Sequence, residues 1–334
     1  MAKNVVAKFT DPERYQAAVR PAQVEIFVTA KGDFQAELRR VELPRLWIQR
    51  GRERLPRVIH STVSAERPPI FFLTSADQVA IHRGGMTVSF GDIVVVGAGS
   101  THHHRSWAPC HWATCSLPRQ DLAAAGHALV GRDLTVPAIT RRLRPALPLI
   151  SRLLKLHEAV GQLADVAPHI LAQPEPARAL EQALVHALVV CLTEDTPTKM
   201  NLGARRHSAI VARFEEYVAQ NPGQPLYLAE ICMAIGVLER TLETSCEEHL
   251  GMGPIRYLWL RRMHLARRTL IGADPSNTTV TQIATGQGFW ELGRFAVSYK
   301  RLFGESPSAT LHRPAGDLRT IQNLPCGFAD SALA

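Results

Sequence analysis

The feature that most constrains this chain is a pattern that occurs twice in its last third. A short apolar helix is followed by a glycine turn and by a second helix that is polar on one side. The first copy spans residues 228–242 with Gly236 at its turn, and the second lies 52 residues further on, counted from Cys232 to Ala284. Glycine suits the positive φ of a tight turn between helices. One such glycine is weak evidence, but two copies predict two helix-turn-helix units.

The second helix of each copy is expected to bury one face and expose the other, because its polar and apolar residues follow helical spacing. The predicted inner faces are Leu242, Cys246, His249 and Leu250 in the first copy, and Phe295, Tyr299, Leu302 and Phe303 in the second. The predicted outer faces are Arg240, Glu243, Thr244 and Glu247 in the first copy, and Gly293, Val297, Lys300 and Arg301 in the second, with Arg294 on the flank. A helix exposed in this way fits the DNA major groove, which is about 12 Å wide.

Further signals occur in the second copy and in the segment between the two copies. Thr279 and Gln282 form a capping-box pattern at the start of the second copy, and Gly304 suits its C-terminal cap. Residues 254–271, between the copies, are apolar on nearly every side, as expected of a helix buried between two subdomains. The alternative is an all-α bundle that binds no nucleic acid.

This part of the chain, over about residues 205–312, resembles the AraC/XylS family of transcription regulators. The resemblance depends most on Gly288-Phe289, on Phe295 and Tyr299, and on the closing run at 302–307. Residues 250–254 resemble the segment that closes the family's first unit. The run at 288–295 is similar to a subgroup that includes ethanolamine-operon regulators and some regulators of aromatic-acid catabolism.

The resemblance implies two helix-turn-helix units that read adjacent major grooves, and an N-terminal domain that senses a small molecule or forms a dimer. It also implies which residues contact DNA. Arg256, Lys300 and Arg301 suit phosphate contacts, which fix register without reading sequence. The predicted DNA-binding residues are Arg240, Thr241, Glu243, Thr244, Arg256, Gly293, Arg294, Val297, Lys300 and Arg301.

Both units depart from the family pattern. Leu238 stands where a serine N-cap is usual, which costs the helix about 1 kcal/mol, and Thr244 replaces a usual arginine. Glutamates surround Arg240, and acidic side chains near phosphates are unfavourable unless they accept a hydrogen bond from cytosine N4. The second unit carries Gly293 and Val297 where long polar side chains would read bases. Which unit dominates specificity therefore stays open.

The N-terminal half belongs to another structural class. Residues 20–118 hold short β-branched and aromatic runs between turn signals, which predicts a small β-barrel or sandwich. Residues 91–102 look like the opening of a cupin motif, so we expect the cupin-like barrel of this family. Helical stretches follow at 145–172 and 176–192. The predicted architecture is α+β multidomain: a cupin-like effector domain at 1–135, a helical dimerisation and linker region at 136–200, a double helix-turn-helix domain at 205–313 and a poorly ordered tail at 314–334.

Histidines cluster after the cupin-like run. Because histidines on barrel strands bind zinc or iron, His102, His104 and His111 are candidate metal ligands. Neighbouring residues of a strand point to opposite faces, however, so at most two of the consecutive His102, His103 and His104 converge. No glutamate follows at the spacing of a cupin metal site. We predict no metal and no other cofactor; a cupin-type metalloenzyme with a helical appendage is the alternative.

Composition narrows the function classes. The net charge of +8 at pH 7 favours polyanions such as nucleic acid. No apolar run approaches the ~20 residues of a transmembrane helix, no secretory signal opens the chain, and its six cysteines form no C-x-x-C pair. We therefore expect a cytoplasmic protein with no membrane partner. The sequence also lacks the common phosphate-loop and hydrolase motifs.

The sequence thus predicts a DNA-binding transcription regulator, an activator more than a repressor, and not an enzyme. Its expected partners are double-stranded DNA, RNA polymerase and a small-molecule effector whose binding residues the sequence does not identify. Leu149, Leu153, Leu156 and Val160 are a candidate seam for a homodimer; alternatively, these helices only pack on the barrel. A further alternative is an N-terminal domain that binds a protein partner.

Overall fold

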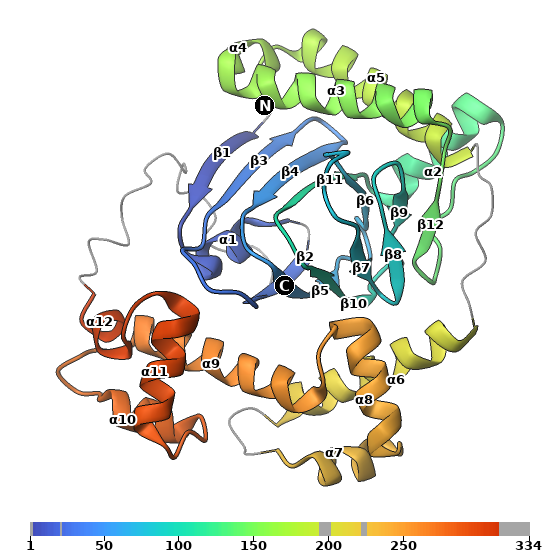
Figure 1. Ribbon diagram of the computed structural model, residues 1–334. Helices are drawn as coiled ribbons and strands as arrows, with labels where there is room; N and C mark the ends of the chain where they lie inside the picture. The colour runs from blue at the N-terminus through green and yellow to red at the C-terminus, as the bar shows by residue number, and fades with distance from the viewer. Residues whose placement is uncertain (1–2, 21, 194–201, 222–225, 314–334) are drawn as a thin grey trace, which may run out of the picture.

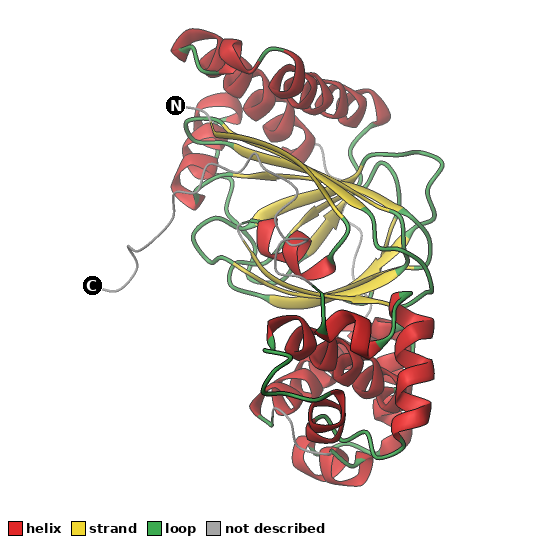
Figure 2. Cartoon of the chain, turned by 90° about the vertical axis from the view of Figure 1, so that its left-hand side faces the viewer, coloured by secondary structure: helices red, strands yellow, loops and turns green. Residues whose placement is uncertain are grey.

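Two antiparallel sheets face each other in the N-terminal part of the computed structural model, which describes residues 3–20, 22–193, 202–221 and 226–313 (Figures 1 and 2). The larger sheet contains, in spatial order, β1 (Lys3–Phe9), β3 (Ala36–Glu42), β4 (Trp47–Glu53), β11 (Cys110–Ser116), β6 (Pro69–Leu73), β9 (Ile93–Val95) and β12 (Arg141–Leu143). The smaller sheet contains β2 (Ala22–Val28), β5 (Arg57–Val63), β10 (Thr101–Ser106), β7 (Ile81–Arg83) and β8 (Met86–Val88). The predicted β-rich domain is confirmed. The closed barrel is wrong, because the described strands pair within two separate sheets, as in a sandwich.

An apolar core fills the space between the sheets. Side chains alternate along each strand, so Ile26 and Ile59 of the smaller sheet belong to one cluster with Phe71 and Trp112 of the larger sheet. A short helix, α1 (Pro12–Ala18), adds the buried Tyr15 to this cluster. The sequence analysis missed α1 and β1, because it interpreted strands only from residue 20 onward.

Helices cover the outer face of the larger sheet (Figure 1). They are α2 (Arg119–Val130), α3 (Leu147–Val166), α4 (Pro168–Leu171) and α5 (Pro174–Thr193). Leu153 and Val160 of α3 are fully buried in this layer, and Leu149 and Leu156 are half-buried against it. Leu153 and Val160 of the predicted dimer seam are therefore buried within the chain itself, whereas Leu149 and Leu156 stay partly exposed.

The outer face of the smaller sheet lies against the C-terminal helices (Figure 2). These are α6 (Leu202–Gln220), α7 (Leu228–Ile235), α8 (Glu239–Leu250), α9 (Pro254–Gly272), α10 (Val280–Gly286), α11 (Leu292–Phe303) and α12 (Pro307–Leu311). Phe27 and Val58 of the sheet belong to the same hydrophobic cluster as these helices. The smaller sheet thus separates the inter-sheet core from the C-terminal helices. The end of the predicted helical linker region, residues 194–200, and the predicted tail, 314–334, lie outside the described residues.

Candidate nucleic-acid interface

Helices α7 and α8 form the first helix pair. α7 ends at Gly236, whose φ of 65° is the left-handed conformation expected at the turn. Ile231 and Ile235 of α7 pack in one cluster with Leu242 of α8. α8 begins after Leu238, whose side chain caps no backbone amide. The glycine turn and the missing N-cap are both as predicted.

α8 buries the predicted inner face and exposes the predicted outer one. Leu242, Cys246, His249 and Leu250 are at most 2% exposed. Arg240, Glu243 and Thr244 are exposed, whereas Thr241 is half-buried and its carbonyl accepts a hydrogen bond from Ser245. Every glutamate of α8 is exposed, and Arg240 is the exposed cation of this helix. The outward face of the first pair is therefore acidic.

Helices α10 and α11 form the second helix pair, which has stronger local signals. The Thr279 hydroxyl accepts a hydrogen bond from the Gln282 amide at 3.2 Å, and the Gln282 side chain accepts one from the Thr279 amide at 2.9 Å. The predicted capping box is therefore present. The turn contains Gly288 at a φ of 75°, and α11 ends at Gly304 at a φ of 81°. The predicted C-terminal cap is also confirmed.

Aromatic residues hold the inner face of α11. The rings of Phe295 and Tyr299 lie 5.6 Å apart, centroid to centroid, and both side chains are buried. The Tyr299 hydroxyl donates to Thr310 of α12 at 2.9 Å, which satisfies its buried polar atom. Phe289, from the turn, packs on Phe295 at 4.9 Å. This arrangement fixes which side of α11 faces outward.

The outward face of α11 is basic with an apolar centre. Gly293, Arg294, Lys300 and Arg301 are exposed, and Val297 is 69% exposed. Arg294 pairs with Glu291 at 3.0 Å on the surface, where such pairs contribute little to stability. No acidic side chain lies within α11 itself. The predicted outer residues of α8 and α11 are thus exposed, and the β-sandwich covers none of them.

Helix α9 joins the two pairs through a single core. It lies between α7–α8 at one end and α10–α12 at the other (Figure 1). Tyr257, Met263 and Leu270 are fully buried along it, as its apolar sequence predicted. Arg256 is exposed near its start, as a phosphate-contacting residue requires.

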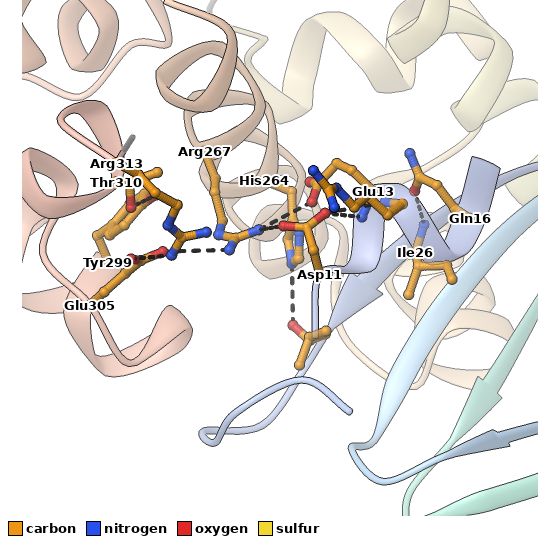
Figure 3. A network of polar contacts seen from close by, with 12 residues as sticks. Asp11, Glu13, Gln16, Ile26, His264, Arg267, Tyr299, Glu305, Thr310 and Arg313 are labelled. Carbon is orange, nitrogen blue, oxygen red and sulfur yellow. Dashed lines mark hydrogen bonds and ion pairs between the residues drawn. The ribbon is translucent and has the colours of Figure 1, made fainter. Parts of the chain in front are cut away.

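A buried ion-pair network connects α9 to the N-terminal part. Figure 3 shows Arg267 between Asp11 and Glu13 on one side and Glu305 on the other. The Arg267 Nη1 atom lies 3.0 Å from Asp11 and 3.1 Å from Glu13, and Nη2 lies 3.5 Å from Glu305. Nearby, His264 Nε2 is 3.4 Å from the Val28 carbonyl. The sequence analysis gave Arg267 no such role, because Asp11 and Glu13 lie more than 250 residues earlier in the chain.

The histidines divide between the two faces of β10, as strand alternation predicted. His102 and His104 point into the inter-sheet core, with ring centroids 6.2 Å apart. His103 points outward and lies 3.3 Å from Glu215 of α6, stacked on His60. His111 lies on β11 and joins neither group.

Among the described residues, one group has the composition of a metal site: His60, His103 and Glu215, whose ligand atoms lie within 4.8 Å of one another. Sequence reasoning missed it, since Glu215 comes from a distant helix. Arg261 lies 3.6 Å from the other Glu215 oxygen. Burial raises the pKa of Glu215, but its interactions with His103 outweigh this and lower the pKa to about 2. These groups fit an ion-paired contact between sheet and helices better than a metal site.

Comparison with known proteins identifies the C-terminal part. A helix-turn-helix domain model matches residues 231–313. The chain is 32% identical over 168 residues to the "Probable thc operon regulatory protein" of Rhodococcus erythropolis, covering 50% of this chain and 48% of that protein. It is 33% identical over 157 residues to the XylDLEGF operon transcriptional activator 3 of Pseudomonas putida, covering 46% of each. The C-terminal part of the chain is thus similar to regulators of the AraC/XylS family.

The chain spans about half the length of the curated relatives it matches. Among solved structures it is similar to the AraC-like transcriptional activator CuxR, at 15% identity over 81% of this chain and 97% of that chain, with a TM-score of 0.41. The family resemblance seen in the sequence is confirmed by the sequence relatives. In the part of the chain that the structure describes, no helix combines the length and the apolar character needed to cross a membrane.

Proposed function

We propose that this chain is a transcription regulator, an activator, that binds double-stranded DNA through two helix-turn-helix units and responds to a small molecule bound in its β-sandwich. The observation that supports the proposal most directly is that α8 and α11 each expose the predicted outer face while their inner faces share one core with α9. In DNA-binding helix pairs, the second helix enters the major groove. Relatives named as operon activators favour activation.

The proposed contacts divide into two kinds. Lys300, Arg301 and Arg256 contact phosphates, and the remaining predicted residues face base edges. Val297 fits this role, because an exposed apolar side chain in the middle of a recognition helix can contact the thymine methyl group. The base-facing set is Arg240, Thr241, Glu243, Thr244, Gly293, Arg294 and Val297.

The proposed division of labour assigns effector binding to residues 1–135, linkage to 136–200 and DNA binding to 205–313. A homodimer and a contact with RNA polymerase remain part of the proposal. Any dimer uses a surface other than Leu153 and Val160, since both are buried within the chain.

The proposed route from effector to DNA passes through the smaller sheet. β10 directs His102 and His104 into the inter-sheet core and Arg105 toward α8, where Arg105 donates to the Leu250 carbonyl at 2.9 Å. The ring of His249 occupies the space that a Cβ at Gly85 would need. A ligand that moves these strands therefore changes the support of α8. It shifts the DNA-binding equilibrium only by its difference in affinity for the two arrangements.

Footprinting on the DNA upstream of the chain's own gene tests the proposal. We expect two protected segments about one helical turn, ~10 bp, apart. Arg294→Ala should weaken binding by about 1–3 kcal/mol if it reads a base, whereas Arg178→Ala, an exposed cation on α5, should leave binding unchanged. Equal affinity for the upstream DNA and for random duplex would contradict the proposal.

A further inference from the structure

The inter-sheet core contains an arginine without an acidic partner. Arg83 of β7 is only 5% exposed, and it pairs with none of the acidic side chains in the described residues. One terminal guanidinium nitrogen contacts His102 Nε2, while Nε has no hydrogen-bond partner. The guanidinium carbon lies 4.6 Å from the centroid of the Phe71 ring. A buried cation in this setting is costly unless something compensates it.

The charges around Arg83 do not balance. Glu53 already forms an ion pair with Arg57, and it also accepts hydrogen bonds from Tyr15 at 2.7 Å and Trp112 at 2.9 Å. Arg57 and Arg83 against Glu53 leave a net charge of +1 inside the sandwich. The protein therefore maintains one uncompensated positive charge in its interior.

The neighbouring histidines do not change this balance. Burial, and then the charge of Arg83, holds the pKa of His102 and of His104 well below the usual value, so both rings are neutral at pH 7. Burial together with Arg57 lowers the pKa of Arg83 to about 9. Arg83 therefore keeps its proton near neutral pH.

Arg83 lines a cavity of about 50 Å³ between the sheets. Two other buried polar atoms on its wall, His104 Nδ1 and Thr114 Oγ1, also have no hydrogen-bond partner. Phe71 and Trp112 supply apolar wall. The volume admits a few water molecules and is well below the ~300 Å³ at which ligand pockets begin. A larger guest must therefore push the lining side chains apart.

We propose that the effector is a small organic carboxylate, whose carboxylate group pairs with Arg83 and whose compact apolar body lies against Phe71 and Trp112. This inference rests on the proposed function, because it names the chemical class of its effector. A guanidinium binds a carboxylate through two parallel hydrogen bonds, and one negative charge cancels the excess of +1. A neutral ligand leaves Arg83 uncompensated, and a phosphate dianion brings a second charge into a largely apolar wall.

The position of Arg83 also connects the cavity to the DNA-binding helices. Gly85 follows two residues later, in the turn that the ring of His249 of α8 packs against. His82, on the opposite face of β7, contacts the Glu248 carbonyl at 3.3 Å. A carboxylate that draws Arg83 toward itself, in a cavity that must widen, therefore acts on the strand that supports α8.

The test uses the full chain with hexanoate, cyclohexanecarboxylate and phenylacetate, each beside its neutral amide. Thermal unfolding and calorimetric titration should show at least one carboxylate that binds and raises Tm with concentration, while its amide does not. If none of the three carboxylates binds, or if the amides bind equally well, the proposal is overturned.

Variants locate the site. Arg83→Met should weaken carboxylate binding at least tenfold without lowering Tm in the absence of ligand, since it removes an uncompensated buried charge. Lys31→Gln, which removes an exposed cation in a turn, should leave binding unchanged. If Arg83→Met does not fold, Thr114→Val keeps the shape of the wall and should weaken binding several-fold. Unchanged carboxylate affinity in the folded variant overturns the proposal.

Gel-shift assays on the same preparations separate this inference from the proposed function. Sequence-specific DNA binding without any carboxylate response overturns the effector class alone. Carboxylate binding without DNA preference supports the site and counts against the regulator.

Discussion

The two helix pairs share one architecture but differ in charge and in support. α11 exposes Arg294, Lys300 and Arg301 with no acidic residue along the helix, whereas α8 surrounds its exposed arginine with glutamates. α8 packs against the smaller sheet through His249 and Leu250, whereas α11 packs against α10 and α12. In the proposed function, this difference separates two tasks: the second pair holds DNA by charge, and the first connects DNA binding to the sandwich.

Phe295→Ala should have the largest effect, and it should destabilise the second helix pair without the first. Removing this ring from the second pair is expected to cost about 3–5 kcal/mol, since it empties a packed aromatic core. Hydrogen exchange should then show lost protection in α10 to α12 with protection retained in α7 and α8. Val297→Ala, at an exposed position, is the control and should change stability by no more than about 0.5 kcal/mol. Equal loss in both pairs would mean that they form one cooperative unit.

The second pair could be predicted almost completely from the sequence, because its determinants are local. The capping box, the turn glycines and the i, i+4 spacing of Phe295 and Tyr299 all act within a few residues of one another. The first pair was predicted from the same signals, including the missing cap at Leu238. The β-rich N-terminal domain was predicted in kind, but the predicted closed barrel was wrong.

The contacts that join the two halves could not be predicted, because they are made between distant segments. Arg267 pairs with Asp11, which lies 256 positions earlier in the chain. The sequence around either residue gives no sign of this contact. Glu215 was likewise not connected with His103. The lack of a partner for Arg83 becomes visible only when the whole interior is assembled, since a charged residue in a short strand usually faces solvent.

Acidification should loosen the first pair before the second. Burial lowers the pKa of His249 to about 4, whereas an unfolded histidine has a pKa of about 6.5. Between these values the unfolded chain binds more protons, so stability is present above about pH 6.5 and is lost as the pH falls toward 4, by at most about 1.4 kcal/mol per pH unit for one group. Hydrogen exchange at pH 7 and pH 5 should show the larger loss in α8.

The matched variant His249→Gln should flatten this pH dependence in α8, because glutamine does not titrate. Other buried histidines, such as His264 on α9, contribute to the whole chain and remain in the variant. A pH response of α8 that is the same with and without His249 would show that the first pair is not held to the sheet through this residue.

Charge substitutions on α8 and α11 should change DNA affinity and its salt dependence by a smaller amount. Lys300→Gln and Arg301→Gln should each reduce the slope of log affinity against log salt by about 0.9, as expected for a lost phosphate contact. Glu243→Gln on the first pair should raise affinity for random duplex, since it removes a negative charge that faces phosphates. Fluorescence anisotropy over a salt series measures both effects. Lower affinity in Glu243→Gln would instead assign this carboxylate to a base.

The N-terminal caps of α8 and α10 give the smallest expected effect and test how firmly each helix pair begins. Thr279→Ala removes the side-chain cap of α10 and should cost about 1 kcal/mol, whereas Leu238→Ser, at a residue that is 78% exposed, should gain a similar amount by capping α8. Chemical denaturation measures both changes. If Leu238→Ser stabilises the chain and leaves effector-dependent DNA binding intact, the uncapped start of α8 has no part in coupling. If the response to effector falls while affinity for DNA stays, then the weak start of α8 is what allows the sandwich to move it.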